Sequence, residues 1–310
     1  MSPQIMTVLG PIAVHELGIT SMHEHILCDI FRTGGGLSNI LDDEGMAIEE
    51  LLHFKRAGGS AMVELSTLEL GRDLEGLERV SRAAGIHIIA GSGFYVDSCH
   101  PPIVRQLNSE KLSRYLVDDV LREAPAPGII GEVGSGRYGA TPSEERSLRA
   151  AARAARRTGR CVTTHAALGD HGLEQLDILL EEGLAADQII IGHVDSFWHL
   201  DMERDLRYCE AVMQRGANVA FDTAGWEEFM PEERRLARIA ALIVRGYGDH
   251  IVLGSDTCRR THYHLLGGRG YDNLLTQFVP RLRATGVSQE MIDRMLIHNP
   301  RRLLALKEPS

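Results

Sequence analysis

The sequence predicts a (β/α)8 barrel, and three observations support this fold class. Short apolar segments alternate with amphipathic helical segments along the chain, there are eight such apolar segments, and 310 residues suit one barrel. Near-continuous apolar strands that alternate with helices are typical of a parallel sheet covered on both faces. We therefore expect a single α/β domain that spans residues 1–310.

The eight predicted strands share a run of apolar or small residues bounded by turn-forming or polar residues. They cover residues 18–25, 60–66, 87–93, 128–134, 161–166, 188–194, 217–223 and 251–256. Between two of them, Met202, Leu206, Cys209 and Met213 show the three- or four-residue spacing of an amphipathic helix. A doubly wound open sheet is the alternative, but no G-x-G-x-x-G follows the first strand. The glycine-rich stretches 34–36 and 267–270 are predicted loops over the carboxyl end of the barrel.

The composition excludes several classes of partner. A net charge of −10 without a basic stripe argues against nucleic acid, and the arginines of residues 153–157 are interpreted as one face of a helix. No window contains the roughly 18 apolar residues of a membrane span, and the N-terminus does not resemble a secretory signal. Five cysteines without a C-x-x-C motif indicate free thiols in a reducing cytoplasm. We expect a cytoplasmic protein that acts on a small molecule, with a homodimer as an alternative to a monomer.

Polar side chains fall where several predicted strands end. His23 and His25 are separated by one residue, so an extended strand would point both imidazoles to the same face. A carboxylate or imidazole within an apolar run is costly to bury unless it is paired or binds a metal. The other groups of this kind are Glu132, His165, His193 and Asp256.

The carboxyl ends of parallel barrel strands meet on one face, so these six side chains should converge. Four imidazoles and two carboxylates can hold two divalent cations, with one carboxylate between them. Each histidine taken alone could instead be a hydrogen-bonded core or rim residue. His87 begins its strand, at the opposite end of the barrel, and is interpreted as structural.

Motifs of a recognisable kind lie along nearly the whole chain: Thr20–His25, Gly131–Gly134, Thr163–His165, Ile191–Asp195, Gly254–Asp256, residues 270–283 and Asn299–Arg302. In these motifs the chain resembles the phosphotriesterase family of the amidohydrolase superfamily. In the phosphotriesterase and lactonase branches a carboxylated lysine bridges the metals, whereas Glu132 stands at that position here. A glutamate there is similar to the phosphotriesterase homology proteins, another branch of the family.

The resemblance implies a role for each of the six residues. His23 and His25 would bind the more buried metal with Asp256, His165 and His193 would bind the more exposed metal, and Glu132 would bridge the two. Zn²⁺ is the expected metal, with Mn²⁺ and Co²⁺ as alternatives. A hydroxide held between the metals would attack a carbonyl or phosphoryl centre, and Asp256 would carry the proton to the leaving group.

Residues that contact the substrate are harder to identify from the sequence. Tyr95 follows the third strand and resembles an aromatic residue near the metals of related lactonases, although packing at the barrel rim is an equal alternative. Trp226 could form a wall of the substrate pocket. Arg259 and Arg260 closely follow Asp256, so they could bind an anionic substrate group or form surface ion pairs.

The leading functional hypothesis is a binuclear-metal hydrolase of carboxylic esters or lactones. A phosphotriesterase and an N-acyl amide hydrolase are alternatives with the same metal centre. A metal- or ligand-binding protein without turnover is an alternative of another class, which a base at Asp256 disfavours. A deaminase is disfavoured because we find no additional acid for it.

Overall fold

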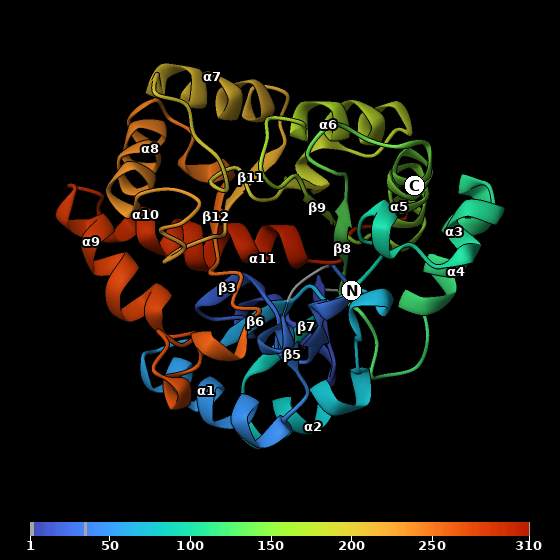
Figure 1. Cartoon of the computed structure of the whole chain (residues 1–310), viewed down its shortest axis with the longest axis horizontal. Helices are drawn as coiled ribbons and strands as arrows, with labels where there is room; N and C mark the ends of the chain where they lie inside the picture. Colours follow the sequence, from blue (N-terminus) through green and yellow to red (C-terminus); the bar gives the residue numbers. More distant parts are fainter. Residues whose placement is uncertain (1–2, 34–35, 310) are drawn as a thin grey trace.

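The computed structural model describes residues 3–33 and 36–309, so Gly34 and Gly35 of the first predicted glycine loop lie outside the described residues. The central sheet has eight parallel strands with helices all around it (Figure 1). The strands are β3 (Thr20–Glu24), β6 (Ala61–Glu64), β7 (His87–Ser92), β8 (Ile129–Gly134), β9 (Val162–His165), β10 (Ile189–Ile191), β11 (Asn218–Phe221) and β12 (Ile251–Leu253). Each lies within one of the eight predicted segments, and the (β/α)8 barrel is confirmed.

The strands pair in sequence order from β3 to β12, and the first and last strands meet just beyond the end of β12. The backbone N–H groups of Ser255 and Asp256 donate to the carbonyl of His23 at 3.3 and 3.0 Å, and His25 N–H donates to Thr257 at 3.2 Å. These bonds close the barrel. They also bring the residues after the last strand beside those of the first.

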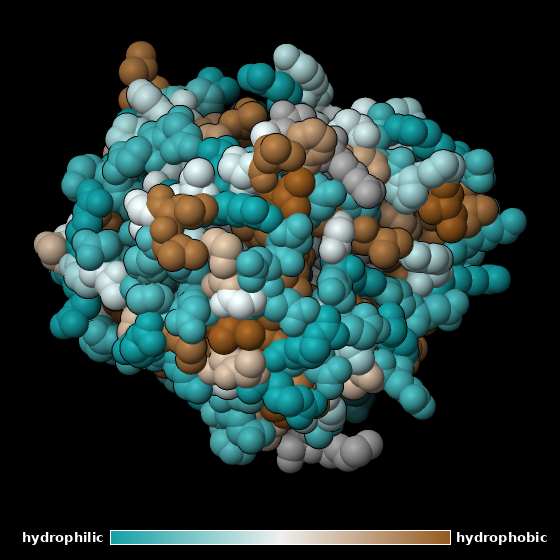
Figure 2. Space-filling view, turned by 60° about the horizontal axis from the view of Figure 1, so that its bottom comes forward, coloured by the Kyte–Doolittle hydropathy of each residue, from teal (hydrophilic) through white to brown (hydrophobic). Residues whose placement is uncertain are grey.

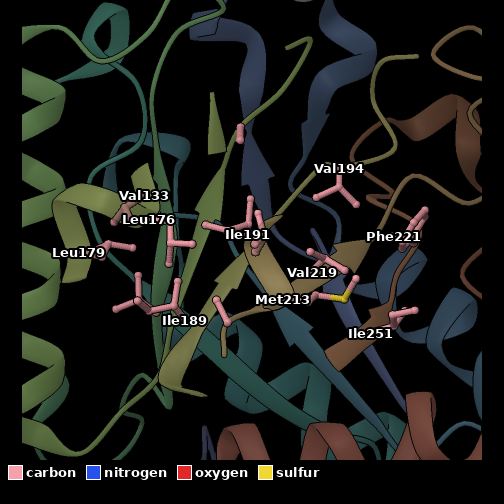
Figure 3. Close-up of a cluster of buried hydrophobic side chains, with 14 of the residues drawn as sticks. Val133, Leu176, Leu179, Ile189, Ile191, Val194, Met213, Val219, Phe221 and Ile251 are labelled. Atoms are coloured by element: carbon pink, nitrogen blue, oxygen red, sulfur yellow. The ribbon is translucent and has the colours of Figure 1, made fainter. Parts of the chain in front are cut away.

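Two apolar layers follow from the alternation of side chains along each strand. Ile190, Ala220 and Val252 point inward, where they join one buried cluster with Met22 and Val63. Their neighbours along the strands point outward and pack beneath the helices. Figure 3 shows part of this outer layer, including Ile189, Ile191, Val219, Phe221 and Ile251.

The outer helices are amphipathic and cover the sheet through their apolar faces. The α-helices are α1 (Glu44–Arg56), α2 (Leu74–Ala84), α3 (Pro102–Gln106), α4 (Ser109–Val120), α5 (Pro142–Thr158), α6 (Gly172–Glu181), α7 (Met202–Met213), α8 (Glu232–Val244), α9 (Val279–Ala284), α10 (Gln289–Asp293) and α11 (Asn299–Leu304). The predicted helix with Met202 and Met213 is therefore α7. Two π-helical turns, Leu274–Phe278 and Arg294–His298, precede α9 and α11.

Four short strands lie outside the barrel, and the sequence did not predict them. β1 (Gln4–Thr7) and β2 (Gly10–Ala13) form an antiparallel hairpin, as do β4 (Cys28–Asp29) and β5 (Ile40–Leu41). The N-terminal hairpin contacts the start of the barrel, because Val8 N–H donates to the carbonyl of Ile88 in β7. Strands this short carry too few alternating residues to give a recognisable pattern.

The face of the molecule in Figure 2 is mostly hydrophilic, with hydrophobic groups scattered over it. Across the described ranges, no helix is long and apolar enough to cross a membrane. Four of the cysteines, as expected, are buried thiols without a disulfide: Cys28, Cys161, Cys209 and Cys258.

Candidate metal centre

The six predicted ligands all lie at or just beyond the carboxyl ends of barrel strands. His23 is in β3 and His25 follows it, Glu132 is in β8, and His165 is the last residue of β9. His193 and Asp256 follow β10 and β12 by two and three residues. All except Asp256 and His165 are almost fully buried, with side-chain exposures of 14 and 16% for those two. The structure thus brings the six side chains together from five strands.

The ligand atoms form two groups that share one carboxylate. One group consists of nitrogens of His23 and His25 with an oxygen of Glu132, and the other of nitrogens of His165 and His193 with an oxygen of Glu132. Within each group the ligand atoms all lie within 4.8 Å of one another. Glu132 Oε1 is 3.5 Å from His25 Nε2, and Glu132 Oε2 is 2.9 Å from His165 Nδ1. Glu132 therefore has the position of a bridging ligand between two sites.

Asp256 extends the first group. Its Oδ1 lies 3.3 Å from His25 Nε2 and 3.8 Å from His23 Nε2. His193 and Asp256 have φ angles of +55° and +45°, a strained conformation for residues other than glycine that is concentrated at functional sites. Here the strained backbone turns both side chains inward at the strand ends.

A glycine makes room for the bridging carboxylate. Gly131 has φ of +142°, and a Cβ there would lie 2.5 Å from the carbonyl oxygen of Thr163 on the neighbouring strand. A larger residue would separate β8 from β9. Glycine at this position keeps Glu132 and His165 close.

Three of the histidines, His23, His25 and His193, are oriented by hydrogen-bond partners at Nδ1, the ring nitrogen that faces away from the centre. Asp222 Oδ2 lies 2.9 Å from Nδ1 of His23, and Asp222 Oδ1 lies 2.9 Å from Nδ1 of His193. Nδ1 of His25 is 2.9 Å from the hydroxyl of Ser66, which donates to Glu64 at 2.5 Å. Such contacts fix the ring and leave Nε2 directed at the centre, as in metal-binding histidines of the carboxylate–histidine–metal type.

The buried carboxylates of the ligand cluster favour positive charge between the six side chains. Burial opposes protonation of His25, but Asp256 and Glu132 outweigh it and raise the pKa of His25 to about 10. Burial likewise opposes ionisation of Glu132, yet the charges of His165 and His23 hold the pKa of Glu132 well below its usual range. The buried carboxylates therefore need cations around them.

The donor set fits metal ions better than it fits a closed hydrogen-bond network. Among the described residues, His23 Nε2 is buried and has no hydrogen-bond partner, although it faces Glu132 and Asp256. An unpaired buried nitrogen is costly unless something else satisfies it. Imidazole and carboxylate ligands in this arrangement suit Zn²⁺ and similar divalent cations.

A cavity of about 240 Å³ opens onto the second group and contains three of the four predicted substrate residues. Tyr95, Trp226 and Arg259 line it, together with His165, His193 and Asp256 of the centre. Arg260 points elsewhere: its Nε donates to the carbonyl of Ile40 at 2.6 Å, and its side chain pairs with Asp42. The structure does not bring Arg260 to the cavity.

Several residues of the site were not identified from the sequence. Asp222 gave the same signal as the ligands, a carboxylate at the end of an apolar strand, but it was not predicted to belong to the site. Phe229 and Cys258 also line the cavity, and a loop position alone gave no signal for either residue. Arg269 lies over the ring of Trp226 at 5.4 Å although 43 residues separate them in sequence, beyond any local motif.

Comparisons with known proteins agree with this geometry. The model of the phosphotriesterase family matches residues 3–304. The chain is 33% identical to the phosphotriesterase homology protein of Escherichia coli, over 91% of this chain and 96% of that protein. It is 31% identical to the N-acetyltaurine hydrolase of Xenopus tropicalis, over 99% of each chain.

Solved structures show the same relationship. The Escherichia coli phosphotriesterase homology protein complexed with phosphate in its active site has a TM-score of 0.87 and 32% identity, covering 93% of this chain and 99% of that chain. A lactonase from Listeria monocytogenes has a TM-score of 0.87 and 27% identity, covering 98% of this chain and 100% of that chain. The predicted resemblance and the prediction of a hydrolase are confirmed at this level. The chain belongs to the phosphotriesterase family.

Proposed function

We propose that this protein is a binuclear-metal-dependent hydrolase of small carboxylic acid derivatives, with esters and lactones as the leading substrate class. The observation that carries the proposal is the pair of ligand groups that share Glu132. Two divalent cations bound there, Zn²⁺ or alternatively Mn²⁺ or Co²⁺, would supply a water of lowered pKa and a positive charge beside the scissile carbonyl. The chain's own residues then have to orient the substrate and move the proton.

Asp256 would accept and return that proton. It lines the cavity beside both ligand groups. Burial raises the pKa of Asp256, but the hydrogen bond with His25 and the charges of His23 and His193 outweigh burial and lower it below the usual range. The carboxylate is therefore ionised at neutral pH, as a general base must be.

Tyr95 would donate a hydrogen bond to the substrate. Its hydroxyl lies 3.2 Å from His165 Nε2, while His165 Nδ1 faces Glu132. If Nδ1 is the ligand nitrogen, Nε2 carries the proton and donates to the Tyr95 oxygen. Burial raises the pKa of Tyr95 well above its usual value, so the phenol keeps its own proton for the substrate.

The cavity wall supports a small substrate with an anionic group. About 240 Å³ is less than the range usual for drug-sized ligands. The guanidinium of Arg259 lies 4.4 Å from the ring centre of Trp226, whose indole N–H donates to the carbonyl of Ser255 at 2.8 Å. Burial, the largest cause, and the charges of Arg269 and Arg259 lower the pKa of His262 to about 3. Both guanidinium groups lie at the Trp226 ring, so this wall carries two positive charges.

This positive wall favours one second candidate, hydrolysis of an N-acyl amide that carries an anionic group. N-acetyltaurine, named for the relatives at 31% identity, is such a compound. An amide needs its leaving amine protonated, which Asp256 could also provide. Phosphotriester hydrolysis is less favoured because Glu132 replaces the carboxylated lysine of that branch.

A substrate screen tests the proposal. Zn²⁺- and Mn²⁺-loaded protein would be assayed on aryl esters, neutral and phosphorylated lactones, N-acyl amino acids, N-acetyltaurine and a paraoxon-like triester. We expect kcat/KM to be highest for an ester or lactone, with an anionic amide as the alternative. A triester as the best substrate, or no turnover by protein with full metal content, would contradict the proposal.

Arg259→Met tests the anionic group separately. For anionic substrates we expect KM to rise about tenfold or more, since a charge-assisted hydrogen bond contributes about 1.5–3 kcal/mol. KM for neutral substrates of the same size should change little. Arg260→Met is the matched control, because Arg260 is paired with Asp42 away from the cavity.

A further inference from the structure

A second cluster of metal-ligating side chains lies outside the barrel, between α1 and the segment that follows β12. Ligand atoms of His53, His264 and Asp272 all lie within 4.8 Å of one another. His53 belongs to α1, whereas His264 and Asp272 come from the chain more than 200 residues later. Figure 1 shows this later segment, in orange, against α1 in blue.

The ring of His264 is oriented by a carboxylate, as the rings of metal-binding histidines commonly are. Its Nδ1 lies 2.9 Å from Oε2 of Glu50, a carboxylate that is only 3% exposed. This contact repeats that of Asp222 with the two histidines of the catalytic centre. A carboxylate on one ring nitrogen fixes the ring and leaves the other nitrogen available to a metal.

The other nitrogen of His264 faces a carboxylate oxygen that nothing satisfies. His264 Nε2 is 3.2 Å from Asp272 Oδ1, yet within the described part of the chain this oxygen is buried and has no hydrogen-bond partner. The two atoms are close without being aligned as donor and acceptor. Two ligand atoms that face a common point have this relation, whereas the atoms of a hydrogen bond would be aligned.

The backbone leaves room for both side chains at one position. Gly270 has φ of +67°, and a Cβ there would collide with the His264 ring and lie 2.7 Å from Asp272 Oδ1. The His53 ring stacks on the His264 ring at 4.4 Å and 30°. Both imidazoles also border a cavity of about 480 Å³, together with Glu49 and Glu50, through which an ion could enter from solvent.

We propose that His53, His264 and Asp272 form a third divalent-cation site, for Zn²⁺ or a similar borderline metal, separate from the catalytic pair. Two imidazoles and one carboxylate are sufficient protein ligands for such a cation, with water completing the coordination. The site would join α1 to the segment that contains Cys258 and Arg259 of the catalytic cavity. It would therefore stabilise the cavity wall without taking part in the reaction.

Zinc analysis after equilibrium dialysis against buffered free Zn²⁺ tests the site. Relative to wild type, His53→Gln and His264→Gln should each bind about one Zn²⁺ per chain fewer and retain kcat. Glu50→Gln should raise the Kd of this Zn²⁺ by about 10–100-fold, the usual effect of losing a carboxylate behind a ligand. His15→Gln, at an exposed histidine elsewhere, is the matched control and should bind as wild type does.

A second background separates this site from the catalytic centre. Glu132→Ala removes the shared carboxylate of the centre but touches none of the three peripheral residues, so it should keep the peripheral Zn²⁺. Introducing His53→Gln into Glu132→Ala should then lower the zinc content by about one further Zn²⁺ per chain. Equal zinc content in wild type and His53→Gln, or equal losses in His53→Gln and His15→Gln, would overturn the proposal.

Discussion

Asp222 connects the two halves of the metal centre, and a single change of its carboxylate to an amide should affect them unequally. Oδ2 serves His23 and Oδ1 serves His193, and the backbone N–H of His193 lies between them, 3.1 Å from Oδ1 and 3.2 Å from Oδ2. The amide of Asp222→Asn has one accepting oxygen and one donating NH₂. The amide oxygen can therefore serve only one of the two imidazoles, and the NH₂ must oppose the ring N–H of the other.

The expected magnitude follows from this asymmetry. Loss of a carboxylate behind a metal-binding histidine weakens metal binding by about 10–100-fold, or about 1.4–2.7 kcal/mol. In Asp222→Asn this loss should fall mainly on one of the two metals, the one whose histidine faces the NH₂. The other metal should be affected much less, and Asp222→Ala should weaken both metals.

Competition with a chromophoric chelator measures the two affinities as successive losses of Zn²⁺. Asp205→Asn is the matched control, because Asp205 is fully buried and lies 2.7 Å from Nδ1 of His199, a histidine outside the centre. This control should release both metals as wild type does. If Asp222→Asn weakened both metals equally, or neither, the assignment of one oxygen to each histidine would be refuted.

Three further predictions concern the ligands themselves. Glu132→Ala should lose at least one metal, because Glu132 is the carboxylate shared by the two ligand groups; unchanged metal content with full activity would contradict the bridge. Asp256→Asn should retain most of its metal while kcat falls about 100-fold or more, since an amide can ligate but cannot accept a proton; near-normal kcat with both metals bound would leave Asp256 as a ligand alone. For metal-free protein, the free energy of unfolding measured in urea should fall as pH rises from 6.5 to about 10. The pKa of His25 is higher in the folded state, so its protonation stabilises that state fully below this range and progressively less across it. Zn²⁺-loaded protein should not show this loss, and a flat or rising profile without metal would argue against the raised pKa.

The sequence predicted the barrel and the convergence of its ligands for one physical reason. A polar residue at the end of an apolar strand is unusual, and parallel barrel strands place all such ends on one face. His23, His165 and Asp256 carry this signal individually. Their convergence required only the fold class, without knowledge of any loop.

The cavity wall could not be predicted in the same way. Arg259 and Arg260 are adjacent in sequence, but one lines the cavity and the other binds Ile40 and Asp42. That difference depends on the path of a loop with no regular period. The role of Asp222 could not be predicted for another reason. A carboxylate that hydrogen-bonds to a metal ligand and a carboxylate that is itself a ligand give the same sequence pattern at the end of a strand.

The seam between β3 and the end of β12 has a consequence for how the protein acquires metal. His23 and His25 lie near the start of the chain, and Asp256 reaches them only when the last barrel strand has joined the first. A chain still lacking that strand, during synthesis or after truncation, would have to bind the inner cation without its carboxylate. Tight loading of the inner cation would thus wait until the ring of strands is complete, and the cation bound by His23, His25 and Asp256 would then close a loop of more than 200 residues. Metal acquisition in this protein would serve as a late quality check on the finished barrel.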